Sequence, residues 1–202
     1  MAFWSKRNSP SYGSISFKRR DRKKLNTAVI YEILTWAAGC IASVVVGAFI
    51  VYFLGLRISV VGTSMEPTLR HSEQVLLDRI SYQFTSPKRG DVIAFYPNGN
   101  TKTHIYIKRV IGLPGERIKI ADEHVYINDA RYFLDISEYT RDAGIAENEI
   151  ELGLDEYFVL GDNRLSSEDS RSANIGNIRS ETIEGKVWFK LGATDRKMGF
   201  VK

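Results

Sequence analysis

The chain has 202 residues, enough for a tail, a membrane anchor and one compact domain with its own core, but not for a second large domain. Its net charge is +4, yet residues 1–26 hold eight basic residues and one acid, whereas the chain from Arg57 onward holds 20 basic and 22 acidic residues. This distribution excludes a nucleic-acid-binding domain, because such domains concentrate positive charge on the folded part.

Cysteine and histidine usage narrows the chemistry further. The single cysteine, Cys40, excludes an intrachain disulfide. The three histidines, His71, His104 and His124, lie apart in the sequence and do not have the spacing of zinc ligands. We therefore expect neither a metal nor a cofactor.

The N-terminal part predicts a tail and an anchor. Between Glu32 and Arg57 the sequence ILTWAAGCIASVVVGAFIVYFLGL has no charge over 24 residues, more than the roughly 20 that a helix needs to cross a bilayer. A cleaved signal peptide would have a shorter apolar stretch, and a buried soluble helix is the other alternative. We predict a basic cytoplasmic tail over residues 1–26, a transmembrane anchor over 27–56 and an extracytoplasmic domain over 57–202. This orientation follows from the basic run KRRDRKK at 18–24.

Residues 57–202 are typical of a mainly β domain. Short runs rich in β-branched and aromatic residues alternate with Gly, Pro, Asn and Asp, which favours antiparallel strands. The runs lie at 57–62, 73–80, 91–96, 104–113, 116–121, 124–128, 156–162 and 185–191. Residues 116–133 are interpreted as a hairpin around the polar link ADE, and residues 137–153 and 170–184 as loops with a short helix.

Ser64 is the first candidate for chemistry. It lies in VVGTSMEPTL at residues 60–69, where a Gly-Thr-Ser turn follows a β run. Such a turn exposes a hydroxyl and leaves backbone N–H groups without strand partners, which is what an oxyanion hole requires. An ordinary turn is the alternative for this segment.

Lys108 is the second candidate, in the alternating run HIYIKRVIGLPGE at 104–116. Burial in an apolar strand lowers the pKa of a lysine, which can then accept a proton from a serine hydroxyl. The alternative is that Lys108 or Arg109 is the outward residue of an edge strand.

A third candidate is the polar run GDNRLSSEDSR at 161–171, which follows the strand-like EYFVL. A run this rich in hydroxyls, an amide and opposite charges can form a hydrogen-bond network that orients catalytic groups. The alternative is a solvated loop of the same composition.

These segments together resemble a known family. In order, SMEPTL, RGDVIAF, YIKRVIGLPG and GDNRxxSxDSR resemble the conserved boxes of bacterial type I signal peptidases, the serine–lysine proteases. The resemblance runs from about Arg57 to Lys190, and the single preceding anchor also fits. It implies a signal-peptidase-like antiparallel β catalytic domain that cuts secretory preproteins after small residues, at Ala-x-Ala sites, beside membrane lipid and without nucleic acid or metal.

The resemblance also implies a role for each matching residue. Ser64 corresponds to the nucleophile, with its backbone N–H in the oxyanion hole, and Lys108 to the general base. Ser167 corresponds to a hydroxyl that orients the lysine. Four charged residues correspond to those that hold the site together: Asp162, Arg164, Asp169 and Arg171. Arg109 and Asp91 match box positions with a structural role, and Met65 and Pro67 shape the turn. Some family members have a serine two residues before the nucleophile as a second oxyanion donor, but Gly62 occupies that position here.

Apolar residues near the boxes are candidates for the substrate pockets. Their alternation suggests that shallow pockets excluding long side chains are lined by Ile58, Val60, Val61, Ile93, Phe95 and Ile107.

Four other interpretations remain open at this point. A Ser-His-Asp triad could use His71 or His104. Self-cleaving repressors share the dyad chemistry but need a DNA-binding head where this chain has an apolar span. The outer domain could also be a membrane-tethered scaffold without catalysis, or a peptidase dedicated to one substrate such as a pilin.

Overall fold

The structure is a computed structural model that describes residues 13, 27–54, 56–133, 139–192 and 197–201. The predicted tail at 1–26 lies outside the described residues except for Gly13. Helix α1 spans Thr27–Leu54, about 42 Å at 1.5 Å per residue, against about 30 Å for the apolar core of a bilayer. Its stretch Thr27–Tyr52 is long and apolar enough to cross a membrane, and none of it is buried. The predicted N-terminal apolar helix is confirmed.

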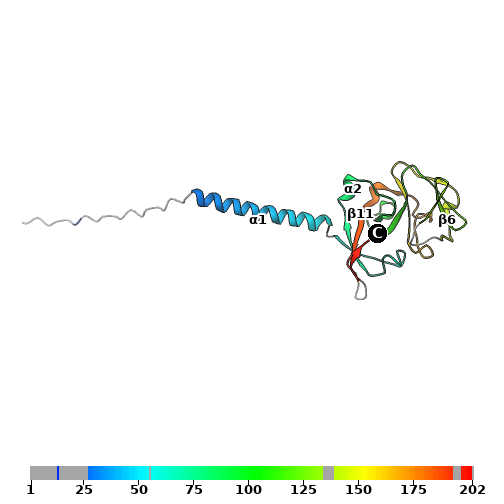
Figure 1. The fold of residues 1–202 in the computed structure, drawn as a ribbon, viewed down its shortest axis with the longest axis horizontal. Helices are drawn as coiled ribbons and strands as arrows, with labels where there is room; N and C mark the ends of the chain where they lie inside the picture. The colour runs from blue at the N-terminus through cyan, green and yellow to red at the C-terminus, as the bar shows by residue number, and fades with distance from the viewer. Residues whose placement is uncertain (1–12, 14–26, 55, 134–138, 193–196, 202) are drawn as a thin grey trace, which may run out of the picture. The chain divides into compact units, whose positions relative to one another are not determined.

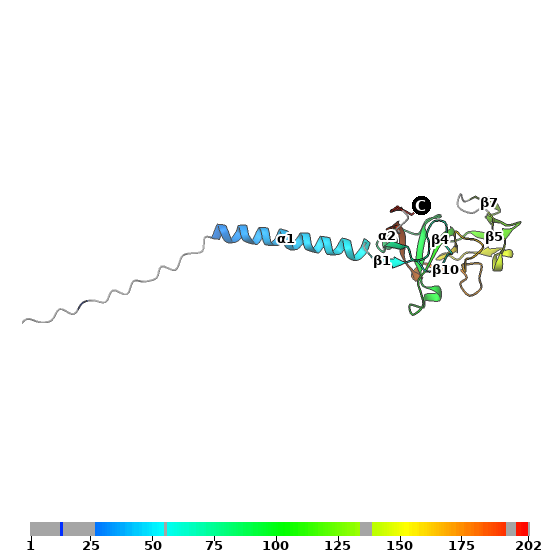
Figure 2. The same cartoon turned by 90° about the horizontal axis from the view of Figure 1, so that it is seen from below.

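The larger sheet of the domain is antiparallel throughout; Figure 1 labels its strand β11, and Figure 2 labels β1, β4 and β10. Its strand order does not follow the chain, because β11 lies between β2 and β3. In spatial order the strands are β1 (Leu56–Ser59), β2 (Gln74–Asp78), β11 (Ile183–Lys190), β3 (Val92–Phe95), β4 (Tyr106–Gly112), β9 (Glu156–Leu160) and β10 (Ile178–Arg179), with β12 (Gly199–Phe200) paired to β11.

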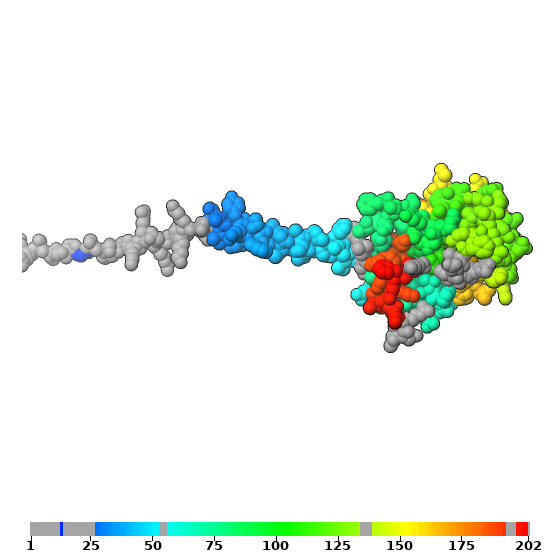
Figure 3. Space-filling model, viewed as in Figure 1, coloured from blue at the N-terminus to red at the C-terminus, as the bar shows by residue number. Residues whose placement is uncertain are grey.

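The smaller sheet has four strands in the order β7 (Ala130–Tyr132), β6 (His124–Ile127), β5 (Arg117–Ala121) and β8 (Ile150–Glu151). The tight link between β5 and β6 consists of Asp122 and Glu123, both with positive φ, as in the turns that suit two-residue hairpins. The predicted hairpin is confirmed, and β7 adds a third strand to it. Figure 3 shows these yellow-green residues gathered at one end of the domain.

Four short helices complete the described elements: α2 (Ser81–Phe84), η1 (Pro97–Gly99), η2 (Gly144–Glu147) and η3 (Ser180–Thr182). The two segments predicted as loops with a short helix contain η2 and η3, but they also contain the two-residue strands β8 and β10. Strands this short have no periodicity that a sequence pattern could reveal.

The core explains why some strands are apolar without alternation. Along β3, Val92 and Ala94 pack into the cluster beneath the segment at 60–69, while Ile93 and Phe95 pack into a second cluster on the other face. Both faces of this strand are therefore buried, which gives the continuous run VIAF. A third cluster, which includes Ile118 and Ile120 on alternate positions of β5, fills the space under the smaller sheet. The prediction of a mainly antiparallel β domain is confirmed.

Candidate active site

The segment that carries Ser64 is a loop held down at both ends. Val60 donates its N–H to Glu73 O (2.8 Å) and accepts from Ser72 N (2.8 Å), which closes the loop at its base. The side chains of Met65 and Leu69 are buried in the core cluster under β2 and β3. Ser64 immediately precedes Met65 in the chain. The packing of Met65 in the core therefore fixes the position of Ser64.

Gly62 shapes the turn before Ser64. Its φ is +90°, in the region that favours glycine, so a serine at this position would be strained. Its N–H donates to His71 Nδ1 at 3.0 Å. The side-chain oxyanion donor of some family members is thus absent at this position. The hydrogen bond to His71 holds the backbone of Gly62 instead.

Ser64 and Lys108 are in direct contact. Lys108 Nζ lies 2.7 Å from Ser64 Oγ, within hydrogen-bond distance. Lys108 lies on β4 between β3 and β9, and its side chain is only 4% exposed. The edge-strand alternative for this residue is wrong, because β4 is a central strand.

The surroundings of Lys108 favour its neutral form. Burial lowers its pKa from 10.5 to about 8, and the carboxylates of Asp169 and Glu168 oppose this shift in part. The ring of Tyr106 lies 5.5 Å from Nζ. An amine of this kind is partly deprotonated near neutral pH and can accept a proton from the serine hydroxyl that it touches.

The polar run at 161–171 holds the nucleophile loop by its backbone. Asn163 N–H donates to Ser64 O at 3.0 Å, and its side-chain amide donates to Thr63 O at 3.3 Å. Among the residues that the structure describes, the N–H of Ser64 itself has no acceptor and remains available to an incoming oxyanion. The contribution of Asn163 was not predicted, because a sequence does not show backbone contacts.

The charged residues of this run fix one another rather than touch the dyad. The fully buried Asp169 accepts from Gly161 N (3.0 Å) and from Arg171 Nε (2.8 Å) and Nη2 (2.9 Å). Arg164 donates to Gly161 O (3.0 Å) and Thr140 Oγ1 (2.8 Å). Burial, followed by the charge of Arg171, lowers the pKa of Arg164 to about 10.

The buried pair of Arg109 and Asp162 joins β4 to the same run. Arg109 donates from Nε and Nη2 to the two carboxylate oxygens, both at 2.7 Å, and from Nη1 to Gly90 O. Each residue is 2% exposed. Asp91 is structural in a similar way, since it accepts from Lys186 Nζ of β11 at 2.6 Å and from the hydroxyl of Tyr82 at 3.0 Å.

Ser167 differs from its predicted role. Its Oγ is buried and has no hydrogen-bond partner among the described residues, so the expected bond to Lys108 is absent. The hydroxyl lies against Gly161, where an added Cβ would be 2.1 Å from it. The serine fills the space beside this glycine.

A small pocket of about 70 Å³ adjoins the dyad. The apolar residues Val60, Val61 and Ile107 line it, as predicted, together with Met65 and Tyr106. Ile93 and Phe95, which were also predicted to line a pocket, are fully buried in the other core cluster, and that part of the prediction is wrong. Ile58 packs against the core beneath the loop.

A family model matches most of the chain. The model described as "Signal peptidase, peptidase S26" matches residues 33–191. The chain belongs to this family. The resemblance seen in the motifs is thereby confirmed, and the match extends from within α1 to the end of β11.

Proteins similar to this chain come from several bacteria. Signal peptidase I U of Bacillus subtilis (strain 168) is 32% identical over 160 residues, covering 76% of this chain and 81% of that protein. Signal peptidase IB of Staphylococcus aureus (strain COL) is 30% identical over 178 residues, covering 79% and 90%. Among solved structures, a signal peptidase I from Enterococcus faecalis V583 is 31% identical with a TM-score of 0.42, covering 51% of this chain and 97% of that one.

Proposed function

We propose that the chain is a membrane-bound serine endopeptidase that removes N-terminal signal peptides from secreted preproteins, with Ser64 as nucleophile and Lys108 as general base. Membership of the signal peptidase family supports the reaction class. The single observation that carries the residue assignment is the 2.7 Å contact between Ser64 Oγ and a buried lysine amine with a lowered pKa.

The first half of the reaction forms an acyl-enzyme. Neutral Lys108 takes the proton of Ser64 Oγ as the oxygen attacks the carbonyl carbon of the scissile peptide. The oxygen of the tetrahedral intermediate accepts a hydrogen bond from the N–H of Ser64. Lys108 then gives its proton to the leaving amine, the C–N bond breaks and the mature protein departs, while the signal peptide remains as an ester on Ser64.

The second half repeats these transfers with water. Lys108 takes a proton from a water molecule as the water oxygen attacks the ester carbon. When the second intermediate collapses, the bond to Oγ breaks and the proton returns from Lys108 to Ser64. The signal peptide leaves as a free carboxylate, and no metal or cofactor is needed for either step.

The small pocket beside the dyad supports a preference for small side chains. At about 70 Å³ the pocket is far smaller than the roughly 300–1,000 Å³ of sites that take drug-sized ligands, which suits a methyl group better than a long side chain. Alanine at the residue before the scissile bond fits these dimensions, in agreement with the Ala-x-Ala sites implied by the motifs.

The apolar helix and the charge distribution support a cell-membrane location. Helix α1 serves as a single-pass anchor, with the basic residues at 18–24 on the cytoplasmic side and residues 57–202 on the other side. A substrate held in the same membrane by its own apolar segment meets the enzyme at a raised effective concentration.

The test is cleavage of a membrane-embedded preprotein with an Ala-x-Ala site by the full chain. We expect Ser64→Ala and Lys108→Ala to lower kcat/KM by about 10³-fold or more, because each removes a group that acts directly on the reacting atoms. Ser166→Ala and Lys119→Ala change exposed residues of the same types and should leave the rate unchanged. An acylating inhibitor should label Ser64 alone.

Two outcomes would contradict the proposal. If wild type and all variants behave alike, the domain is a scaffold. If the wild type cuts a pilin precursor but no other preprotein, the substrate class is narrower than proposed.

A further inference from the structure

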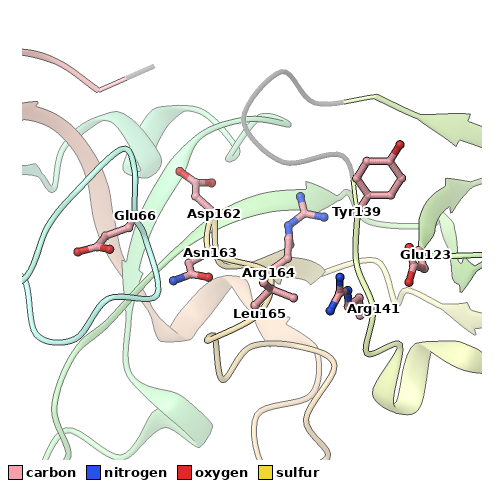
Figure 4. A pocket seen from close by; sticks show the side chains of 8 residues that line it. All are labelled: Glu66, Glu123, Tyr139, Arg141, Asp162, Asn163, Arg164 and Leu165. Atoms are coloured by element: carbon pink, nitrogen blue, oxygen red, sulfur yellow. The ribbon is translucent and has the colours of Figure 1, made fainter.

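A second, larger cavity of about 630 Å³ opens beside the nucleophile loop (Figure 4). Its walls come from four segments of the chain, one of which is the β5–β6 link with Glu123. Glu66 belongs to the nucleophile loop, Asn163 and Leu165 to the polar run at 161–171, and Tyr139 and Arg141 to the stretch that follows the smaller sheet's β7. We call this cavity the polar cleft.

The polar cleft adjoins Ser64 but is separate from the small pocket. Asn163 lines the cleft and donates to the carbonyl of Ser64, and Glu66 is two residues beyond the nucleophile. The two cavities share no lining residue, and both touch the segment at 60–66. A peptide that places a small side chain in the small pocket and its scissile carbonyl at Ser64 must continue beyond that carbonyl, and the polar cleft is a cavity next to Ser64 that can receive it.

The outer wall of the polar cleft has the chemistry to bind a carboxylate. Arg141 is exposed, and among the described residues it forms no ion pair or hydrogen bond, although Glu123 lies on the same wall. Tyr139 beside it is 58% exposed. An exposed guanidinium without a partner among the described residues suits a carboxylate, because charge-assisted hydrogen bonds from arginine to carboxylate are strong.

Two of the other charged side chains that line the cleft are bound within the fold. Asp162 is held by Arg109, and the guanidinium of Arg164 is bound to Gly161 O and Thr140 Oγ1. Glu66 stands at the end nearest the nucleophile, where it disfavours an acidic residue. The cleft therefore has an acidic side chain, Glu66, on the loop that carries Ser64, and at its other end the guanidinium of Arg141 with the carboxylate of Glu123 on the same wall.

We propose that the polar cleft binds the segment of the preprotein that follows the scissile bond, and that Arg141 selects an acidic side chain in it. This inference rests on the proposed function. It makes the first residues of the mature protein, and not only the signal peptide, part of what the enzyme recognises.

The experiment compares substrates that are identical up to the scissile bond and carry Asp, Asn or Lys at one of the second to sixth positions after it. With the full chain in detergent at low salt, we expect one of these positions to favour Asp over Lys by about fivefold in kcat/KM. Arg141→Glu should reverse that preference while the Asn substrate is still cut, and Glu123→Gln should increase it. High salt should reduce the preference, since these charges are exposed.

Arg179→Glu is the matched control, because Arg179 is an exposed arginine that lines a different cavity. It should leave the preference as in the wild type. If Arg141→Glu cuts the Asn substrate normally and keeps the wild-type order of Asp and Lys, the inference is overturned while the proposed function stands. If the wild type cuts none of the substrates, the proposed function fails and this inference fails with it.

Discussion

At the scale of the residue, burial has two effects on Lys108. It lowers the pKa of the amine, and it reduces the free energy of unfolding when the amine is charged. The side chain is 4% exposed, and the fall of its pKa from 10.5 to about 8 corresponds to roughly 3 kcal/mol against the charged form. Asp169 and Glu168 lower this penalty, but they do not remove it. The same desolvation that disfavours the ammonium favours the neutral amine, which is the form that the proposed role as base requires.

The pH dependence of activity follows from this pKa. Below about pH 8 the neutral fraction of Lys108 rises tenfold for each pH unit, so we expect kcat/KM to rise by the same factor and to level off above pH 8. The measurement is a pH profile of kcat/KM on an Ala-x-Ala preprotein. A profile that is level between about pH 6 and 9 would exclude lysine as the base.

The pH dependence of stability gives an independent readout. Because the pKa of Lys108 is lower in the folded than in the unfolded chain, the unfolded state binds more protons between about pH 8 and 10.5, and wild-type stability rises with pH in that window. We expect inactive Lys108→Met to be more stable than wild type by up to about 3 kcal/mol below pH 8, and the difference to vanish towards pH 10.5.

Denaturant unfolding of the detergent-solubilised chain at pH 7 and pH 10 measures this difference. Lys119→Met is the control, since Lys119 is exposed and should give no pH-dependent change. An advantage of Lys108→Met that is equal at both pH values would mean that packing, not charge, sets its stability.

The sequence predicted the pairing of Ser64 with Lys108 better than the positions of their neighbours. Ser64 and Lys108 belong to distinctive motifs, and the structure brings them together. Alternation placed Val60 and Ile107 at the pocket correctly, but it could not tell which of two buried faces Ile93 occupies. The contact from His71 to Gly62 was not foreseen, because it depends on the path of the backbone around a turn.

At the scale of the element, Gly161 is where strand β9 passes into the polar run and approaches the nucleophile loop most closely. A Cβ on Gly161 would lie 2.1 Å from Ser167 Oγ and 2.5 Å from Ser64 O. Neither neighbour can withdraw freely, since the first is buried and the second is backbone bonded to Asn163. The absence of a side chain here lets the two segments meet.

We therefore expect Gly161→Ala to displace Ser64 from Lys108 and to lower kcat by at least about tenfold, because small misplacements of a nucleophile are costly. Gly185→Ala is a matched control on β11, where a Cβ would lie 2.3 Å from Asp78 O. Both variants should be less stable in thermal unfolding, but only the first should lose activity per folded molecule. Equal activity of the two would show that the contact at Gly161 is not needed for alignment.

The elements were predictable in kind but not in arrangement. The longer strands of the domain have β-branched and aromatic patterns, and the structure has them where the sequence predicted them. Strands β8 and β10 have two residues each and exist only because neighbouring strands pair with them. The position of β4 in the middle of its sheet also depends on pairings between distant segments, which a local pattern does not contain.

At the scale of the whole molecule, the orientation proposed for the chain depends on charge outside the described residues. Six basic residues lie between 18 and 24, directly before α1, while the chain from Arg57 onward is slightly acidic. Basic residues close to a span stay in the cytoplasm. The division into tail, anchor and domain remains a prediction from this pattern.

Replacing the six basic residues at 18–24 with Gln should reduce the fraction of molecules whose domain lies outside the cytoplasm. Leu154 is 93% exposed, so Leu154→Cys reports the position of the domain by its reaction with a membrane-impermeant maleimide on intact cells. Labelling should be nearly complete with the native tail and clearly lower with the Gln tail. Replacing six exposed basic residues of the domain instead should leave labelling unchanged, and an equal loss in both would contradict the role of the tail.

The place of β11 in the larger sheet affects the order in which the protein can be made. Strand β11 comes near the end of the chain, yet it separates β2, which follows the nucleophile loop, from β3, which pairs with the lysine strand β4. Until residues 183–190 have been synthesised, the halves that carry Ser64 and Lys108 have no strand to join them. A nascent chain without residues 183–190 therefore lacks the strand that lies between β2 and β3, and we expect the contact between Ser64 and Lys108 to form only late in synthesis.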